Sequence, residues 1–209
     1  MKRILICIAA LLASAALMIA QTPQEIIDRM DAEMNKGDQM GLAITMEMKI
    51  PILGVVSARI NSRGDFSRTE MKVRDIKSTM WSDGTTTWTY TPSDNELVID
   101  NSSKSSSSTD DNVQMLKGIT EGYDVKLTKE TADAWYFDCR KSKTNADKDD
   151  PKKMNLVVAK GSYLPLELST KAKGITISMK DPVIGVNEAD LKFDISKIPA
   201  GVKVTDKRE

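Results

Sequence analysis

Histidine is absent from all 209 residues of this chain. Without an imidazole group, the chain cannot build a Ser-His-Asp or Cys-His nucleophile, a His-ligated zinc site or a base that titrates near neutral pH. Mechanisms that use only carboxylates stay open, because acidic residues are abundant. The acids fall in charged runs such as residues 147–150, however, and runs of this kind are usually solvated loops. We therefore expect that the chain is not an enzyme.

Cofactor motifs and a charge bias are missing as well. The sequence has no Gly-rich loop that would cradle a phosphate and no Asp-x-Asp-x-Asp-Gly calcium loop, so we expect no cofactor and no metal. Basic and acidic residues each number 30, which gives no basic surface for binding nucleic acid. The composition therefore favours a binding function that needs neither a metal nor a nucleotide.

The first 20 residues have the pattern of a secretory signal peptide. Met1–Arg3 supplies a short basic start, residues 4–20 are uncharged and rich in alanine, and a polar chain begins at Gln21. We place the cleavage site after Ala20, with the Ala13–Ala15 stretch as an earlier alternative. The competing interpretation is an uncleaved membrane anchor, which would need about 20 apolar residues. We expect the exported chain, residues 21–209, to be periplasmic.

The two cysteines bear on anchoring and on disulfides. Cys7 lies near the start of the apolar run, and Gln21 stands where a lipidated cysteine would follow cleavage. We therefore expect a soluble chain without a lipid anchor. Cleavage would leave Cys139 alone, so no intrachain disulfide could form, and its alternating surroundings predict a small buried core residue. Residues 21–209 are enough for a single domain with a core.

A helix is predicted to open the exported chain. Thr22 suits the N-cap, Pro23 suits the first turn, and Glu25 completes a capping box. Apolar residues then recur at helical spacing, and a glycine suited to closing the helix follows them. These residues are Ile26, Ile27, Met30, Met34 and Gly37. The pattern describes one amphipathic helix whose apolar face covers a core.

From about residue 40 the apolar period changes from helical spacing to two, which is typical of half-buried strands. Turn residues separate the alternating segments at hairpin spacing. The segments are residues 42–50, 56–60, 88–90, 97–99, 123–127, 135–139, 154–158, 164–168, 175–179 and 193–195. About ten strands joined in this way predict one large, strongly curved antiparallel sheet.

One segment interrupts the strand pattern. Residues 101–109 form a Ser-rich loop, and Asp110 and Asp111 can cap a short helix that follows. We interpret this helix as a mobile lid with an apolar side made of Val113, Met115, Leu116 and Ile119. The predicted fold is therefore mainly β with α: an open, half-closed antiparallel β-barrel covered by an N-terminal helix and a short lid helix.

Methionine is unusually frequent for a chain with so few aromatic residues. Ten of the 12 methionines lie beyond the predicted signal peptide, and only 5% of the residues are aromatic. Methionine is flexible and polarizable, so it either fills gaps in a core or lines a cavity that adapts to alkyl chains. The lipid-cavity prediction comprises Met46, Met48, Phe66, Met71, Met80, Trp88, Tyr90, Leu97 and Ile99.

Two motifs resemble those of periplasmic outer-membrane lipoprotein carriers, the LolA-like proteins. Residues 82–92 match the hairpin Ser-Asp-Gly-x-x-x-Trp-x-Tyr-x-Pro. Residues 193–206 look like the closing segment Phe-x-Phe … Pro-x-Gly-Val-x-Val-x-Asp, with Ile195 in place of the second aromatic residue. The order of the predicted elements is also similar from about residue 22 to residue 209.

The resemblance implies a function. Members of that family form an open β-barrel closed by helices and hold lipoprotein acyl chains in a hydrophobic cavity. They accept cargo from an ATP-driven releasing complex in the inner membrane and pass it to a receptor in the outer membrane. A carrier of this kind, expected as a monomer, is the leading hypothesis. The alternative is a general lipid-binding or envelope-sensing module of the same fold.

The family also uses an arginine on an early strand to hold the closed lid by hydrogen bonds. The nearest match here is Arg63, although the match requires a one-residue gap, and Gly64 replaces the usual proline. Arg59 and Arg68 are close competitors for this latch. Arg63 could equally be a solvated turn residue.

Overall fold

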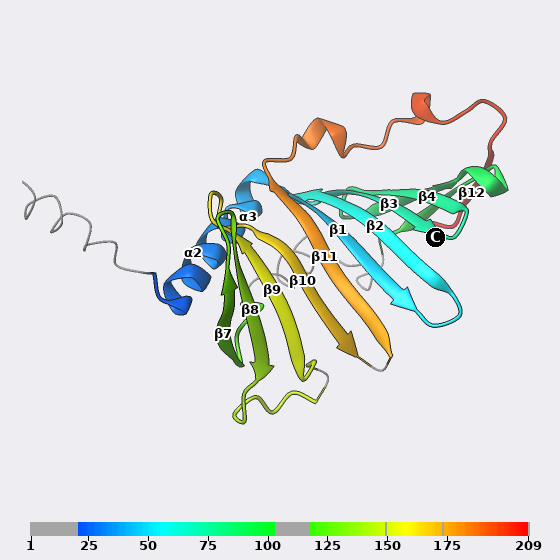
Figure 1. Ribbon diagram of the computed structural model, residues 1–209. Helices are drawn as coiled ribbons and strands as arrows, with labels where there is room; N and C mark the ends of the chain where they lie inside the picture. Colours follow the sequence, from blue (N-terminus) through cyan, green and yellow to red (C-terminus); the bar gives the residue numbers. More distant parts are fainter. Residues whose placement is uncertain (1–20, 103–117, 149, 173, 209) are drawn as a thin grey trace, which may run out of the picture.

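The computed structural model describes residues 21–102, 118–148, 150–172 and 174–208 (Figure 1). The predicted signal peptide lies outside these residues. So do Val113, Met115 and Leu116 of the predicted lid, whereas Ile119 lies within them. None of the helices in the described part of the chain is long and apolar enough to cross a membrane.

The N-terminal helix α2 (Pro23–Asn35) begins as predicted. The Oγ1 atom of Thr22 accepts a hydrogen bond from the Glu25 amide at 3.2 Å, and the Glu25 carboxylate accepts one from the Thr22 amide at 3.0 Å. This reciprocal pair confirms the capping box. Gly37 does not close α2, since it opens a second short helix, α3 (Gly37–Met40).

The rest of the described chain is one sheet of 12 strands in the order β12-β6-β5-β4-β3-β2-β1-β11-β10-β9-β8-β7. Every neighbouring pair is antiparallel except β12 and β6, which are parallel. The strands are β1 (Leu42–Ile50), β2 (Gly54–Arg63), β3 (Phe66–Val73), β4 (Ile76–Ser82), β5 (Thr86–Thr91), β6 (Glu96–Asn101), β7 (Tyr123–Glu130), β8 (Ala134–Lys141), β9 (Lys153–Ala159), β10 (Pro165–Ala172), β11 (Ile175–Ile184) and β12 (Lys203–Asp206). The predicted fold class, an open and mainly antiparallel β-structure with an N-terminal helix, is confirmed.

The strand inventory differs from the prediction in three places, one of which is β12, a segment that the alternating pattern did not include. Strands β3 and β4 were not expected, because small polar side chains such as Ser67 and Thr69 break the apolar alternation on one of their faces. The predicted strand at residues 193–195 is wrong. Asp194 there accepts a hydrogen bond from the Ser196 amide and caps the 3₁₀ turn η4 (Ile195–Lys197).

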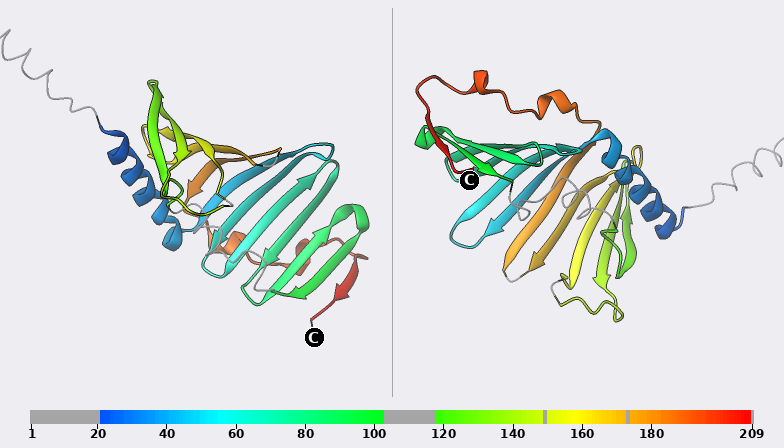
Figure 2. Two further views of the ribbon diagram at one scale, coloured as in Figure 1. Left: turned by 90° about the horizontal axis from the view of Figure 1, so that it is seen from below. Right: turned by 180° about the vertical axis from the view of Figure 1, so that it is seen from behind.

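Helix α2 packs against one face of the sheet, which we call the inner face; it is the face that carries Leu42 and Ile44 of β1 (Figure 2). The α2 side chains Ile26, Ile27, Met30 and Met34 are at most 2% exposed. Their partners in the core are Leu42, Ile44, Trp135, Phe137, Cys139, Met154, Leu156, Val158, Leu168 and Met179. The core therefore lies over β1 and the half of the sheet from β11 to β8.

The C-terminal segment crosses the opposite, outer face over the other half of the sheet (Figures 1 and 2). It contains the 3₁₀ turns η3 (Glu188–Asp190) and η4, and it ends in β12. Phe193 stacks on Trp88 with ring centroids 4.9 Å apart and meets the edge of Trp81 at 5.6 Å. We call residues 187–202 the tail segment.

Candidate lipid-binding face

Strand register shows which side chains share the inner face. Successive residues of a strand point to opposite faces, and directly paired residues on neighbouring strands point to the same face. Starting from Met48, the register continues through Val56 and Val73 to Ile76. This row of four aliphatic side chains, which we call the rim row, runs along the end of the sheet where the β1–β2 and β3–β4 turns lie.

A second and a third row run parallel to the rim row. Met46 pairs with Ala58, which pairs with Met71. The next row runs from Ile44 through Ile60 and Thr69 to Met80. Together with the rim row, these rows make the inner face of β1–β4 predominantly aliphatic and rich in methionine.

Helix α2 does not extend over all of this face. The buried core that α2 forms reaches Met46 and Ile60 at its margin. Met71 is 38% exposed and Ile76 is 55% exposed, whereas Leu156 and Val158 under the helix are fully buried. The apolar part of the inner face of β3 and β4, made of Met71, Val73, Ile76 and Met80, is thus only partly covered, unlike the inner face of β8 and β9.

The aliphatic character of the inner face ends at a row of hydroxyl groups. Ser62, Ser67, Ser82 and Thr87 succeed one another across β2, β3, β4 and β5. Ser62 and Ser67 are 2% and 8% exposed, and the Ser62 hydroxyl donates to the Leu42 carbonyl at 3.4 Å. The inner face therefore changes from aliphatic at the rim to hydroxylated at the opposite end of these strands.

The same register divides the predicted lipid-cavity residues between the two faces of the sheet. Four of them, the methionines, lie on the inner face: Met46, Met48, Met71 and Met80. The remaining five lie on the outer face: Phe66, Trp88, Tyr90, Leu97 and Ile99. These nine side chains therefore do not line one common surface.

The outer-face residues belong to the layer under the tail segment. Leu97 is fully buried although it lies on the outer face, and Leu191 of the tail segment is 1% exposed. The Lys192 ammonium lies 4.8 Å from the centre of the Phe66 ring. Trp88 of the 82–92 motif thus packs against Phe193 of the tail segment.

All three latch candidates lie on the outer face. Arg63 donates to the Val186 carbonyl at 3.1 Å, just after β11. Arg59 donates to the Thr45 hydroxyl at 3.0 Å and to the Asp181 carbonyl at 2.9 Å. Arg68 pairs with Glu70 and lies 6.0 Å from the centre of the Trp81 ring. Most of the predicted lid lies outside the described residues, so Arg63 as a lid latch stays a prediction.

Ile119 is the predicted lid residue that the structure describes. It lies in the turn before β7, is half-buried and packs against the core under α2. Its neighbour Thr120 is buried. The prediction that this residue belongs to a mobile cover is untested.

The electrostatics of the core fit a structural role for its polar groups. Burial, followed by the nearby Asp138 carboxylate, raises the pKa of the Cys139 thiol to about 11. Burial also raises the pKa of Asp31, with Asp28 and Glu121 adding to the effect. A thiol held in its neutral form is a poor nucleophile, and in the described ranges no cluster of acidic or cysteine side chains is arranged to hold a metal ion.

The Ser82–Gly84 turn of the sequence motif is held by an acidic side chain. The Asp83 carboxylate accepts hydrogen bonds from the Thr85 amide at 2.9 Å, the Thr85 hydroxyl at 2.8 Å and the Thr86 amide at 2.7 Å. Desolvation raises the pKa of Asp83, but these hydrogen bonds outweigh it, so the net shift is downward. This turn explains the Asp-Gly of the motif and sets the register of β4 against β5.

Sequence reasoning missed the rim row. Val56 was assigned to a strand, but Val73 and Ile76 belong to strands that were not predicted at all. The signal was present in the arrangement Val73-Arg74-Asp75-Ile76, in which two aliphatic residues flank a charged pair suited to a tight turn. That pattern places both aliphatic residues on one face of a hairpin.

Comparison with known proteins gives structural neighbours only. No protein-family model matches the sequence, and no curated protein sequence matches it. A conserved protein from Thermus thermophilus is 17% identical with a TM-score of 0.46, and the match covers 90% of this chain and 100% of that one. A LolA superfamily protein from Nitrosomonas europaea is 13% identical with a TM-score of 0.33, and the match covers 84% of this chain and 99% of that one.

A third neighbour is a DUF1329 family protein from Desulfovibrio piger, 12% identical with a TM-score of 0.34, covering 84% of this chain and 98% of that one. The second neighbour bears the name of the family that the sequence motifs resemble. At these identities the likeness concerns the fold alone and says nothing about cargo or partners.

Proposed function

We propose that this chain is a periplasmic carrier that binds the acyl chains of lipoproteins on the inner face of β1–β4 and carries them from the inner to the outer membrane. The observation that carries the proposal is the partly covered aliphatic surface beyond α2, with Met71 and Ile76 exposed by 38% and 55%. On this proposal the protein acts by binding and not by catalysis. Its partners are a releasing complex at the inner membrane and a receptor at the outer membrane.

The physics of acyl-chain transport favours such a surface. Burying a methylene group contributes about 0.8 kcal/mol, so an acyl chain crosses an aqueous compartment only in a protein that covers it. Carriage also requires release, and a surface that is open along one side allows the chain to leave without unfolding the core. Methionine side chains at positions 46, 48, 71 and 80 adapt to chains of different shape.

A binding experiment with matched variants tests the proposed face. The purified protein should bind a dansyl-labelled fatty acid and keep it bound in the presence of EDTA, because no metal is involved. Met71→Asp places a carboxylate on the inner face and should weaken binding about tenfold, since a charge beside an acyl chain loses hydration. Val183→Asp is the control, because Val183 is 49% exposed on the outer face.

Two results would contradict the proposed face. One is a wild-type protein without displaceable binding of the labelled fatty acid. The other is an equal loss of binding in the Met71 and Val183 variants, which would place the acyl site away from the inner face.

Depletion of the protein in its host separates a carrier from a lipid sensor. Loss of a carrier leaves lipoproteins at the inner membrane, as measured by fractionation of the two membranes. Loss of a sensor changes gene expression while lipoprotein sorting continues. Normal sorting after full depletion would therefore exclude the carrier function and favour the sensing module.

A further inference from the structure

The β1–β2 turn exposes aliphatic side chains at the end of the sheet. Ile52 is 101% exposed, and Leu53 beside it is 37% exposed. Ile52 also has a φ of 70°, a backbone conformation that is rare for a β-branched residue. The chain thus holds a large apolar side chain in solvent at a position where a glycine or asparagine would be less strained.

The turn is braced from the neighbouring hairpin. Arg74, in the β3–β4 turn, donates from Nε to the Leu53 carbonyl at 3.2 Å and from Nη2 to the Ile52 carbonyl at 3.3 Å. These bonds tie the two turns together. Because the bonds use the backbone carbonyls of Ile52 and Leu53, both aliphatic side chains stay free to meet a partner.

Further exposed aliphatic residues lie next to these turns. Val55 is 49% exposed and Ile76 is 55% exposed. Ile76 is the last residue of the rim row, which leads along the inner face to Met48. Val55 pairs with Lys49 and points to the outer face, whereas Ile76 follows the Arg74 turn that holds Ile52 and Leu53 and so places the tip of the β1–β2 turn next to the rim row.

Basic residues flank this apolar tip on the outer side. Lys49, Lys72 and Lys77 are exposed and point to the outer face, since their strand neighbours Met48, Met71 and Ile76 lie on the inner face. Within the described part of the chain none of the three lysines forms an ion pair. Asp75 is the one acidic residue in the β3–β4 turn.

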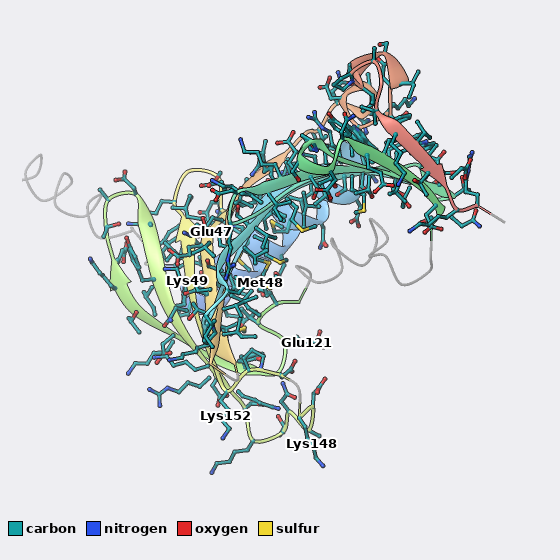
Figure 3. All side chains as sticks on the ribbon, turned by 90° about the vertical axis from the view of Figure 1, so that its right-hand side faces the viewer. Glu47, Met48, Lys49, Glu121, Lys148 and Lys152 are labelled. Carbon is teal, nitrogen blue, oxygen red and sulfur yellow. The ribbon has the colours of Figure 1, made fainter. Side chains whose placement is uncertain are left out.

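Among the other turns at the same end of the sheet, the β10–β11 turn follows the exposed Lys171 and has no acidic residue beside it. The β8–β9 loop carries Lys148 and Lys152 (Figure 3), but Asp147 and Asp150 lie beside them. Positive charge without matching acids therefore runs along this end of the sheet from Lys171 of β10 to the β3–β4 turn. We call its apolar and basic part on β1–β4, made of Lys49, Ile52, Leu53, Lys72, Arg74, Ile76 and Lys77, the rim patch.

We propose that the rim patch docks on an anionic lipid bilayer, with Ile52 and Leu53 inserted among the lipids and the lysines against the phosphate groups. A bilayer fits this patch because aliphatic side chains project from a turn, with basic groups at their base. A lysine is attracted to an anionic membrane surface when it lies within about a Debye length of that surface. A protein partner would instead be expected to offer a pocket for Ile52.

Docking of this kind gives the proposed carrier a route for its cargo. An acyl chain that leaves the bilayer at exposed Ile76 follows the aliphatic rim row toward Met48 without crossing a polar strip, with Val56, 9% exposed, at the buried centre of the row. This step rests on the proposed function, whereas docking of the rim patch on lipid does not.

Vesicle binding tests the inference with the full-length gene product, purified as cells export and process it and with its N-terminus checked by mass spectrometry. It should co-sediment with vesicles of phosphatidylcholine mixed with phosphatidylglycerol, and less with phosphatidylcholine alone. Ile52→Ser combined with Leu53→Ser should weaken this binding by about tenfold or more, through lost apolar burial. Lys72→Gln combined with Lys77→Gln should weaken it about tenfold and reduce its salt dependence.

Matched variants away from the rim patch serve as controls. Ile195→Ser removes an aliphatic side chain that is 61% exposed in the tail segment. Lys126→Gln combined with Lys129→Gln removes two exposed charges from β7, an edge strand that four strands separate from β1. Both controls should bind vesicles like the wild type, and all variants should show the wild-type unfolding midpoint because the changed side chains are exposed.

A second measurement reports insertion directly. An environment-sensitive fluorophore on Ile52→Cys should shift to the blue with anionic vesicles, whereas the same label on Ile195→Cys should not. Cys139 is fully buried, so the new thiol is the one expected to react. No vesicle binding by the wild type, equal binding by the rim-patch and control variants, or a shift produced only by an envelope protein would each overturn the inference.

The experiment keeps the two proposals apart. The Ile52 and Leu53 variant should bind the dansyl-labelled fatty acid like the wild type, because neither side chain belongs to the inner face of β1–β4. Vesicle docking without fatty-acid binding would overturn the carrier proposal and leave the rim patch in place. Fatty-acid binding without vesicle docking would overturn the rim-patch inference and leave the carrier proposal in place.

Discussion

The two halves of the sheet bury their apolar side chains on opposite faces. From β8 to β11 the core lies on the inner face under α2, where Leu156 and Val158 are fully buried. From β3 to β6 the buried layer lies on the outer face, where Leu97 is fully buried and Phe193 of the tail segment stacks on Trp88. A single sheet thus changes its packed face at about β1 and β2.

This change of face explains how a small domain can leave apolar surface open. An antiparallel sheet needs one packed face for stability, and the second face is then free to be polar or to bind a ligand. In the half from β3 to β6, the outer face supplies the packing. The inner face of the same strands is therefore not needed for stabilising the fold by packing, and the methionines on it can stay partly exposed.

The largest loss of stability is expected in the half that α2 covers. Leu156→Ala removes a fully buried side chain from the centre of β9 and should lower the free energy of unfolding by about 2–5 kcal/mol. Leu166→Ala in the neighbouring strand is the control, since Leu166 is 45% exposed, and it should cost about 1 kcal/mol or less. Urea unfolding followed by circular dichroism measures both free energies. Similar losses in the Leu156 and Leu166 variants would contradict the view that the core of this half lies on the inner face under α2.

A smaller loss is expected in the layer under the tail segment. Phe193→Ala removes the ring that contacts both Trp81 and Trp88, and because Phe193 is half-buried we expect a loss of about 1–3 kcal/mol. Tryptophan fluorescence should shift to the red, and amides of residues 187–202 should exchange faster with deuterium. Ile195→Ala should change neither, and slow exchange in the Phe193 variant would show that other contacts hold the tail segment.

The sequence predicted local structure better than it predicted faces. The capping box of α2 depends on residues three positions apart, so Thr22 and Glu25 identified it correctly. The alternation in residues 135–139 and 154–158 marked β8 and β9, whose buried residues pair with one another: Trp135 with Val158, Phe137 with Leu156 and Cys139 with Met154. Strands β3 and β4 were missed because Ser67, Thr69 and Ser78 occupy inner-face positions that carry aliphatic residues elsewhere.

The division of the predicted cavity residues has a similar cause. Alternation shows that Trp88 and Tyr90 share a face, but it cannot show which face of a two-sided sheet that is. The answer depends on the Asp83 turn, which pairs Trp88 with Trp81 and thereby places both on the side opposite Met80. Register between strands, and the position of the tail segment, are long-range properties that the pattern of one strand does not contain.

The Asp83 turn offers a test that depends on pH. Its pKa is lowered in the folded protein, so its stabilising effect is present above the ordinary value of 3.8 and is lost as pH falls through the folded value. Asp83→Ala should lower the free energy of unfolding by about 1 kcal/mol near neutral pH, a modest value because the turn is exposed. In strong acid it should have no effect. Asp83→Asn keeps an oxygen acceptor and should lose less, without this pH dependence. If Asp83→Ala lowered the free energy of unfolding equally at neutral pH and in strong acid, the Asp83 carboxylate would not be what stabilises the turn.

The smallest effect is expected for Arg63, where the tail segment leaves the sheet. Among the described residues its guanidinium makes one hydrogen bond, to the Val186 carbonyl, so Arg63→Leu should lower the free energy of unfolding by about 0.5–1 kcal/mol and speed deuterium exchange near residues 186–191. Arg68→Leu breaks a surface ion pair with Glu70 and should cost less than about 0.5 kcal/mol. The latch hypothesis adds a separate expectation, that Arg63→Leu retains bound fatty acid while passing cargo on less well, because the closed empty state is lost. Normal transfer by Arg63→Leu and blocked transfer by Arg68→Leu would assign the latch to Arg68 and leave Arg63 as a tether of the tail segment.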